Sequence, residues 1–190
     1  MTVRETDVPG VLIVEPQRHA DERGTFEEVW HQARYAEEGV SETFVQDNVS
    51  RSKRGVLRGL HYQVGEAVQG KLVTVLAGRV WDVAVDLRRD LPSFGQWAGV
   101  ELSAESGQQL YVPEGCAHGF LAMSDDAVVH YKCTTYWSPE AERTIRWDDP
   151  TLEIEWPLDR LHHLAAGRPI LSDKDAAAPT LNEMDSGDLP

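Results

Sequence analysis

The residues with the clearest capacity for chemistry lie in the segment 55–63, which reads GVLRGLHYQ. Histidine suits general acid–base work, because its ordinary pKa lies close to neutral pH. On a strand His61 faces away from Arg58, unless a bulge at Gly59 re-aims the chain. A single strand histidine is usually a hydrogen-bonded structural residue. The catalytic interpretation gains weight only because further polar residues recur on neighbouring predicted strands.

Those further residues are mostly bases and amides, although the chain carries a net charge of −14, from 32 acids and 18 bases. Such a charge argues against nucleic acid as a partner, because phosphate backbones bind basic surfaces. Bases gathered inside an acidic protein instead indicate a local site for a small anion. The candidates are Arg23, Glu28, Gln46, Asn48, Arg58, Lys71, His118, Tyr131 and Lys132.

Other catalytic sites find less support in the sequence. His61 and His118 could be metal ligands on separate strands, but a typical site needs at least three ligands and position 63 is Gln63. We therefore predict no metal. Gly-x-Ser-x-Gly, Gly-x-Gly-x-x-Gly and Walker motifs are all absent from the sequence, which disfavours a serine hydrolase and the corresponding nucleotide sites.

Short β-rich segments must position these side chains. Apolar or alternating runs predict strands over 12–16, 44–50, 96–103, 108–113, 118–124 and 127–137, and two strands within 72–87 joined by a turn at 77–79. One short helix is expected over 31–39, ended by Gly39. Many strands at short spacing predict an antiparallel sandwich or barrel.

The 190 residues suffice for one domain, predicted over 1–175, with a loosely ordered acidic tail over 176–190. The longest apolar runs are too short to span a membrane, and the N-terminus lacks the apolar stretch of a signal peptide, so we expect a cytoplasmic protein. Cys116 and Cys133 are predicted to be buried free thiols.

The ordered motifs resemble the dTDP-4-dehydrorhamnose 3,5-epimerase family over about 11–175. They read DERGTFEE, FVQDNVS, GVLRGLHYQ, KLV, DVAVDLR, PEGCAHGF, YKCTTY, WDDP, WP and LSDKD. The resemblance implies a mainly β fold, a cupin-type jelly-roll barrel with a few short helices. It also implies a homodimer with strands shared across the interface, no cofactor, and a dTDP-linked 4-keto-6-deoxyhexose as substrate. Extra residues around 159–168 blur the local match.

The resemblance assigns a role to each site residue. His61 matches the catalytic base, Tyr131 the proton donor on the other face of the sugar, and Lys71 the cation beside the ketone oxygen. Asp175 matches the carboxylate that orients the base, although Asp173 lies two residues away. Substrate-binding positions are matched by Arg23, Glu28, Gln46, Asn48, Arg58, His118, Glu142 and Lys174, and the base-stacking position by Trp137, where the family often has Tyr.

Three alternatives remain at this stage. A relative that epimerises only C3 or only C5, as in antibiotic-sugar biosynthesis, would carry the same catalytic residues. A non-catalytic sugar-binding barrel would require neither His61 nor Tyr131. A metal-dependent cupin oxygenase would need further metal ligands. We favour epimerisation at both carbons, because Lys71, His61 and Tyr131 are all present.

Overall fold

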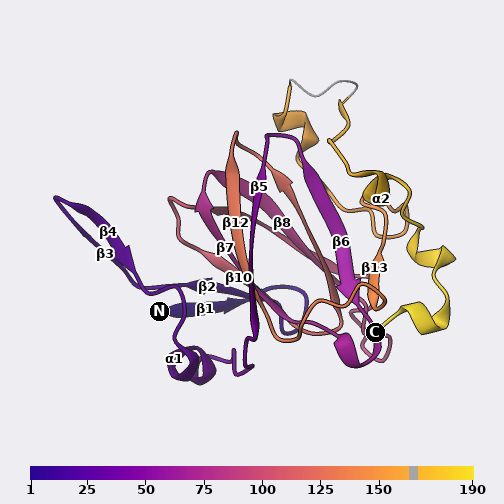
Figure 1. The fold of residues 1–190 in the computed structure, drawn as a ribbon, viewed down its shortest axis with the longest axis horizontal. Helices are drawn as coiled ribbons and strands as arrows, with labels where there is room; N and C mark the ends of the chain where they lie inside the picture. The colour runs from indigo at the N-terminus through magenta and orange to yellow at the C-terminus, as the bar shows by residue number, and fades with distance from the viewer. Residues whose placement is uncertain (163–166) are drawn as a thin grey trace.

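The computed structural model describes residues 1–162 and 167–190, so part of the stretch 159–168 lies outside the described residues. Two large antiparallel sheets face each other (Figure 1). The six-stranded sheet has the order β1-β2-β10-β7-β12-β5. Its strands are β1 (Thr2–Glu5), β2 (Leu12–Glu15), β10 (Gln109–Val112), β7 (Lys71–Ala77), β12 (Ala127–Cys133) and β5 (Gln46–Ser52).

The five-stranded sheet has the order β13-β6-β11-β8-β9. Its strands are β13 (Glu142–Thr144), β6 (Leu57–Gln63), β11 (Cys116–Ala122), β8 (Arg79–Asp86) and β9 (Trp97–Ser103). The hydrogen-bonded ladders do not close into a continuous barrel, so the jelly roll is a flattened sandwich. The mainly β, cupin-like prediction is confirmed in this form.

The main core lies between the sheets and is built mostly from valine and alanine side chains of both, including Val73, Val129 and Ala84, together with Phe120. A second cluster covers the outer face of the five-stranded sheet. Along β8, Asp82, Ala84 and Asp86 face the inter-sheet core, so this strand points two carboxylates inward. Such inward carboxylates need polar partners. Asp82 pairs with His118, and Asp86 pairs with Arg88.

The predicted elements are found close to their expected positions. Each predicted strand overlaps an observed one, and the turn between β7 and β8 falls at Gly78, whose φ is +72°. The expected helix is α1 (Gln32–Glu37), followed by Gly39 at φ +98°. Cys116 and Cys133 are buried free thiols, as predicted. The sequence did not lead us to expect β1, β13 or the hairpin formed by β3 (Arg18–Asp21) and β4 (Gly24–Glu27).

A bulge in β6 decides which way the site residues point. The pairing of β6 with β11 shifts register between His118↔His61 and Phe120↔Arg58. Residues directly opposite one another share a face, and His118 and Phe120 are two apart on one strand, so Arg58 and His61 both face the inter-sheet space. A Cβ on Gly59 would lie 2.5 Å from the Gly119 Cα, so only glycine allows this approach.

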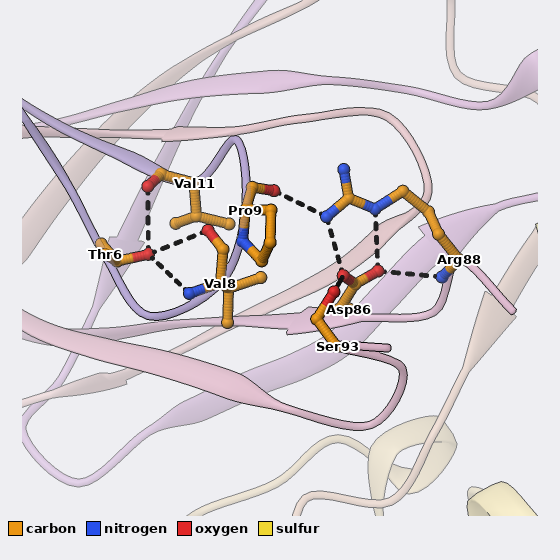
Figure 2. Close-up of polar contacts among 7 residues, drawn as sticks. All are labelled: Thr6, Val8, Pro9, Val11, Asp86, Arg88 and Ser93. Carbon is orange, nitrogen blue, oxygen red and sulfur yellow. Dashed lines mark hydrogen bonds and ion pairs between the residues drawn. The ribbon is translucent and has the colours of Figure 1, made fainter. Parts of the chain in front are cut away.

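A buried ion pair between Asp86 and Arg88 lies at the C-terminal end of β8 (Figure 2). The guanidinium of Arg88 donates to both oxygens of the fully buried Asp86, with Nε at 2.8 Å from Oδ1 and a second nitrogen at 2.8 Å from Oδ2. Ser93 Oγ donates to Oδ2 at 2.6 Å, and Arg88 also donates to the Pro9 carbonyl at 2.7 Å. The network joins the N-terminal loop to the β8–β9 turn.

The hairpin β3–β4 stands away from the two sheets as an arm (Figure 1). Phe26 on this arm is 73% exposed. The C-terminal segment runs back along β6 and β13 instead (Figure 1). Where the sequence suggests a loosely ordered tail, the structure has Leu181 in the outer apolar cluster and Asp188 paired with Arg143 at 2.5 Å.

Candidate active site

A histidine and a carboxylate form the centre of the site. His61 Nε2 lies 2.6 Å from Asp175 Oδ1, and Asp175 is 3% exposed. Asp175 sits in the short helix α2 (Asp173–Ala176), where the N-cap Ser172 accepts a hydrogen bond from its backbone N–H. Burial alone would raise the pKa of Asp175, but the hydrogen bond from His61 holds that pKa below its ordinary value. The carboxylate is therefore ionised and can orient the imidazole.

Lys71 enters the site from the opposite sheet, at the start of β7. It is 8% exposed, and its Nζ donates only a long 3.4 Å hydrogen bond, to the His61 carbonyl. Among residues 1–162 and 167–190, no carboxylate lies within 4 Å of this ammonium. Burial lowers the pKa of Lys71, and the more distant charges of Glu142 and Asp82 act against that change. A buried cation with few partners is poised for a developing negative charge.

Tyr131 lies on β12, also in the sheet that faces His61, where it pairs with Val73 and with Asn48. Burial raises the pKa of Tyr131 above its ordinary value, although Arg58 opposes the rise. The phenol therefore stays protonated near neutral pH and can donate a proton. Because His61 and Tyr131 come from facing sheets, they approach the space between the sheets from opposite sides.

A cleft of about 350 Å³ joins these groups; it is lined by Gln46, Asn48, His61, Gln69, Lys71, Tyr131, Trp137 and Glu142. Trp137 is 53% exposed and stands on the loop after β12. Three glutamine side chains hold that loop: Gln46 Oε1 accepts the Trp137 N–H at 3.0 Å, Gln63 Oε1 accepts the Ser138 N–H at 2.6 Å, and Gln69 Nε2 donates to the Thr135 carbonyl at 2.7 Å.

Three further predicted residues lie beside the cleft. Lys174, next to Asp175, donates to Glu142 at 2.6 Å. Arg58 faces the inter-sheet space, where its Nε donates to Ser52 Oγ at 3.1 Å. His118 is 6% exposed and does not line the cleft; its Nε2 lies 2.9 Å from Asp82 Oδ1. The structure thus brings His61, Lys71, Arg58, His118 and Lys174 close to one cleft.

Two predicted site residues lie elsewhere in the chain. Arg23 is on the arm, where it pairs with Asp21 at 2.5 Å. Glu28 follows the arm and pairs with Arg34 at 2.9 Å. Neither lines the cleft that holds His61.

Comparison with known proteins places this chain in a family. The sequence pattern described as dTDP-4-dehydrorhamnose 3,5-epimerase matches residues 5–183. A protein of that name from Salmonella typhimurium is 52% identical over 184 residues, covering 96% of this chain and 97% of the relative. The chain belongs to the dTDP-4-dehydrorhamnose 3,5-epimerase family.

Solved structures agree with this assignment. A 3,5-epimerase from Legionella pneumophila, in complex with dTDP-4-keto-L-rhamnose, has a TM-score of 0.92 and 49% identity, covering 100% of this chain and 97% of the other. ChmJ, a 3'-monoepimerase from Streptomyces bikiniensis solved with dTDP-quinovose, has a TM-score of 0.83 and 34% identity, covering 93% and 86%. By both measures the chain is more similar to the Legionella 3,5-epimerase than to ChmJ.

Sequence reasoning missed three polar residues of this epimerase-family site: Gln63, Gln69 and Asp82. Asp82 alternates with apolar residues along β8, but this alternation alone does not say which face of the strand is inward. The second oxygen of Asp82 is buried without a partner among the described residues. Gln63 was noticed only as a position where a second histidine was missing, and nothing in its local sequence indicated that it would hold the Trp137 loop.

Two findings concern other kinds of function for this epimerase-family chain. Within residues 1–162 and 167–190, no group of three or more His, Cys, Asp or Glu side chains is arranged to hold a metal ion. No helix in the same residues is long and apolar enough to cross a membrane.

Proposed function

We propose that the protein epimerises dTDP-4-dehydro-6-deoxy-D-glucose at C3 and C5, giving dTDP-4-dehydro-L-rhamnose. The observation that carries the proposal is the placement of a base and a protonated phenol on facing sheets, with a buried ammonium lining the same cleft. The relatives at 49% and 52% identity bear the name of this activity, which supports action at both carbons.

The reaction follows from the geometry. Asp175 holds His61 through Nε2, which leaves Nδ1 to take the hydrogen at C5 or C3. The electron pair moves to the C4 oxygen, and the Lys71 ammonium stabilises the resulting enolate. Tyr131 Oη then donates a proton to the same carbon from the opposite face, which inverts it. Solvent reprotonates the phenolate and takes the proton from His61, so that the net change is an isomerisation.

The substrate's other parts have partners as well. The indole of Trp137 offers an exposed face on which a thymine ring stacks. Arg58 and Lys174 supply positive charge beside the cleft for the diphosphate. His118, directly opposite His61 on β11, is a further substrate-binding position. Gln46, Asn48 and Glu142 offer polar groups for the hydroxyls. The reaction requires neither cofactor nor metal, and dialysis against a chelator should leave turnover unchanged.

The working unit is a homodimer in which the arm of one copy reaches the cleft of the other. The arm carries Arg23 and the exposed Phe26, and it projects from its own sheets (Figure 1). This explains why Arg23 and Glu28 lie away from their own cleft. A cytoplasmic location, expected from the sequence, is tested by fractionation of expressing cells.

Product analysis in deuterated water tests the activity. Deuterium should enter at C3 and C5 with the wild type and at neither carbon with His61→Asn. Exchange at one carbon alone would instead identify a single-site epimerase, as ChmJ is named. Exchange at neither carbon with the wild type would refute the proposal.

Mixing two inactive variants tests the dimer. If arms cross, His61→Asn and Arg23→Ala subunits form mixed dimers with one intact site, so random pairing should restore about a quarter of wild-type activity. Light scattering on the wild type gives the mass directly. No rescue on mixing, or a monomer mass, would contradict the crossed-arm arrangement.

A further inference from the structure

The WDDP motif at 147–150 and the last residues of the chain contribute nothing to the cleft, yet they hold a segment that carries a catalytic group. We define the C-terminal strap as residues 170–189. Its first part is fixed by a parallel bridge between Val56 and Ile170. Asp175 follows five residues later, on the single turn of α2. Because a helix of one turn is not stable in water by itself, its position depends on the contacts of the rest of the strap.

The first downstream anchor is Asp149. This residue is 2% exposed, and its Oδ2 accepts the backbone N–H of Leu181 at 2.6 Å. Its Oδ1 accepts the N–H groups of Thr151 and Leu152, at 2.7 and 3.1 Å. A carboxylate that accepts three backbone donors is fully used. Asp149 therefore ties the strap to the loop after β13.

The second anchor lies on the two strands that carry the site. Tyr62 Oη donates to the Asp188 carbonyl at 2.8 Å, and Arg143 pairs with the Asp188 carboxylate at 2.5 Å. Tyr62 follows His61 on β6 and points to the outer face of the sheet, into the cluster that also contains Leu181. One strand thus carries the base on its inner face and holds the strap on its outer face.

We propose that Tyr62 and Asp149 are positioning residues of the epimerase, which act on turnover by holding the strap so that the Asp175 carboxylate stays against His61. The proposal rests on the proposed function for its kinetic readout. Neither residue lines the cleft. Loss of either anchor removes hydrogen bonds that hold the strap downstream of Asp175, while the apolar contacts of Leu181 remain. A small displacement of a catalytic group costs rate more than substrate binding.

Kinetics of Tyr62→Phe and Asp149→Asn test this inference. Each should lower kcat by about 3- to 30-fold, with KM changed by less than about twofold. The matched control is Tyr35→Phe, which removes the hydrogen bonds of a buried hydroxyl to the Val29 carbonyl and to Gln109 Oε1. Tyr35 lies in an apolar cluster that contains no residue of the strap. The kcat of this variant should stay within about twofold of wild type at a similar loss of melting temperature.

A double-mutant cycle with Asp175→Asn decides whether the anchors act through the carboxylate. In that background, Tyr62→Phe should cause no further loss of kcat, because the carboxylate that Tyr62 helps to position is already absent. An equal fold-loss in both backgrounds would overturn the proposal, as would an unchanged kcat in Tyr62→Phe. Tyr62→Phe removes one oxygen atom and keeps the ring, so it preserves the test should Asp149→Asn fail to fold.

Nuclear magnetic resonance gives a readout independent of turnover. The low-field imidazole N–H signal of His61, assigned by its loss in His61→Asn, reports the hydrogen bond to Asp175. It should shift or broaden in Tyr62→Phe and Asp149→Asn and stay unchanged in Tyr35→Phe. An unchanged signal in both strap variants would overturn the positioning role. A wild type without epimerase activity but with this signal pattern would instead sink only the proposed function.

Discussion

Replacing Lys71 by methionine should make the protein more stable and remove most of its activity. The ammonium is 8% exposed, has one 3.4 Å hydrogen bond to a backbone carbonyl, and has no carboxylate within 4 Å among the described residues. Methionine keeps the unbranched shape and removes the charge. Replacing poorly compensated buried charge with apolar groups typically stabilises by about 1–3 kcal/mol, which in a protein of this size raises Tm by roughly 3–10 °C.

The sign of the pH dependence follows from the lowered pKa of Lys71. Between that lowered value and the ordinary 10.5, the unfolded chain binds the proton more tightly than the folded one. Wild-type stability from this group therefore rises as pH increases through that window. Lys71→Met has no such gain, so its advantage in free energy of unfolding should be largest at neutral pH and should narrow as pH approaches 10.5.

Urea unfolding of both proteins at several pH values between 7 and 10 measures this difference. The control is Lys132→Met. Because Lys132 pairs with Asp47 at 2.7 Å, this variant should not be more stable than wild type at any of these pH values. In the same preparations, kcat/KM of Lys71→Met should fall by about 10²- to 10³-fold. A variant that is less stable than wild type at pH 7, or an advantage that does not change with pH, would refute this account of Lys71.

Three more outcomes follow. His61→Asn should lower kcat by about 10²- to 10⁴-fold with dTDP affinity kept, as steady-state kinetics and calorimetry would show; near-normal turnover contradicts the base assignment. Trp137→Ala should weaken dTDP binding by roughly 10-fold, because the stacking face for the thymine ring is lost. An unchanged Kd by calorimetry would mean that the thymine binds elsewhere. Asp86→Asn should cost about 3–5 kcal/mol in urea unfolding, because it leaves the Arg88 charge without its buried partner; a loss below 1 kcal/mol would mean that the network in Figure 2 is dispensable.

Local patterns predicted the strands well, because alternation and turn residues are short-range signals. The run 72–87 shows this, since Gly78 alone marks the reversal between β7 and β8. The β3–β4 hairpin was missed because its strands are polar and exposed, with little apolar alternation to read. The C-terminal segment looked loosely held because its anchors, Asp149 and Tyr62, are distant in sequence.

The candidate site divides in the same way. His61, Lys71 and Tyr131 stand in recognisable motifs, and the structure brings them to one cleft. The sequence did not decide between Asp175 and Asp173 as the partner of His61; in the structure, Asp175 contacts His61. The burial of His118 against Asp82 depends on the register of three strands, which no local pattern reports.

The loop that bears Trp137 is tied to the sheets by side chains, whereas His61, Lys71 and Tyr131 are built into strands. Exchanging a glutamine such as Gln46 or Gln69 moves the loop without touching a ladder hydrogen bond. With the nucleotide stacked on Trp137, as we propose, nucleotide preference and epimerisation chemistry can change separately during evolution. A descendant that accepts a different base would change residues over 134–138 and the side chains beneath them. Gly59 of β6, by contrast, admits no side chain, because it packs on the backbone of Gly119.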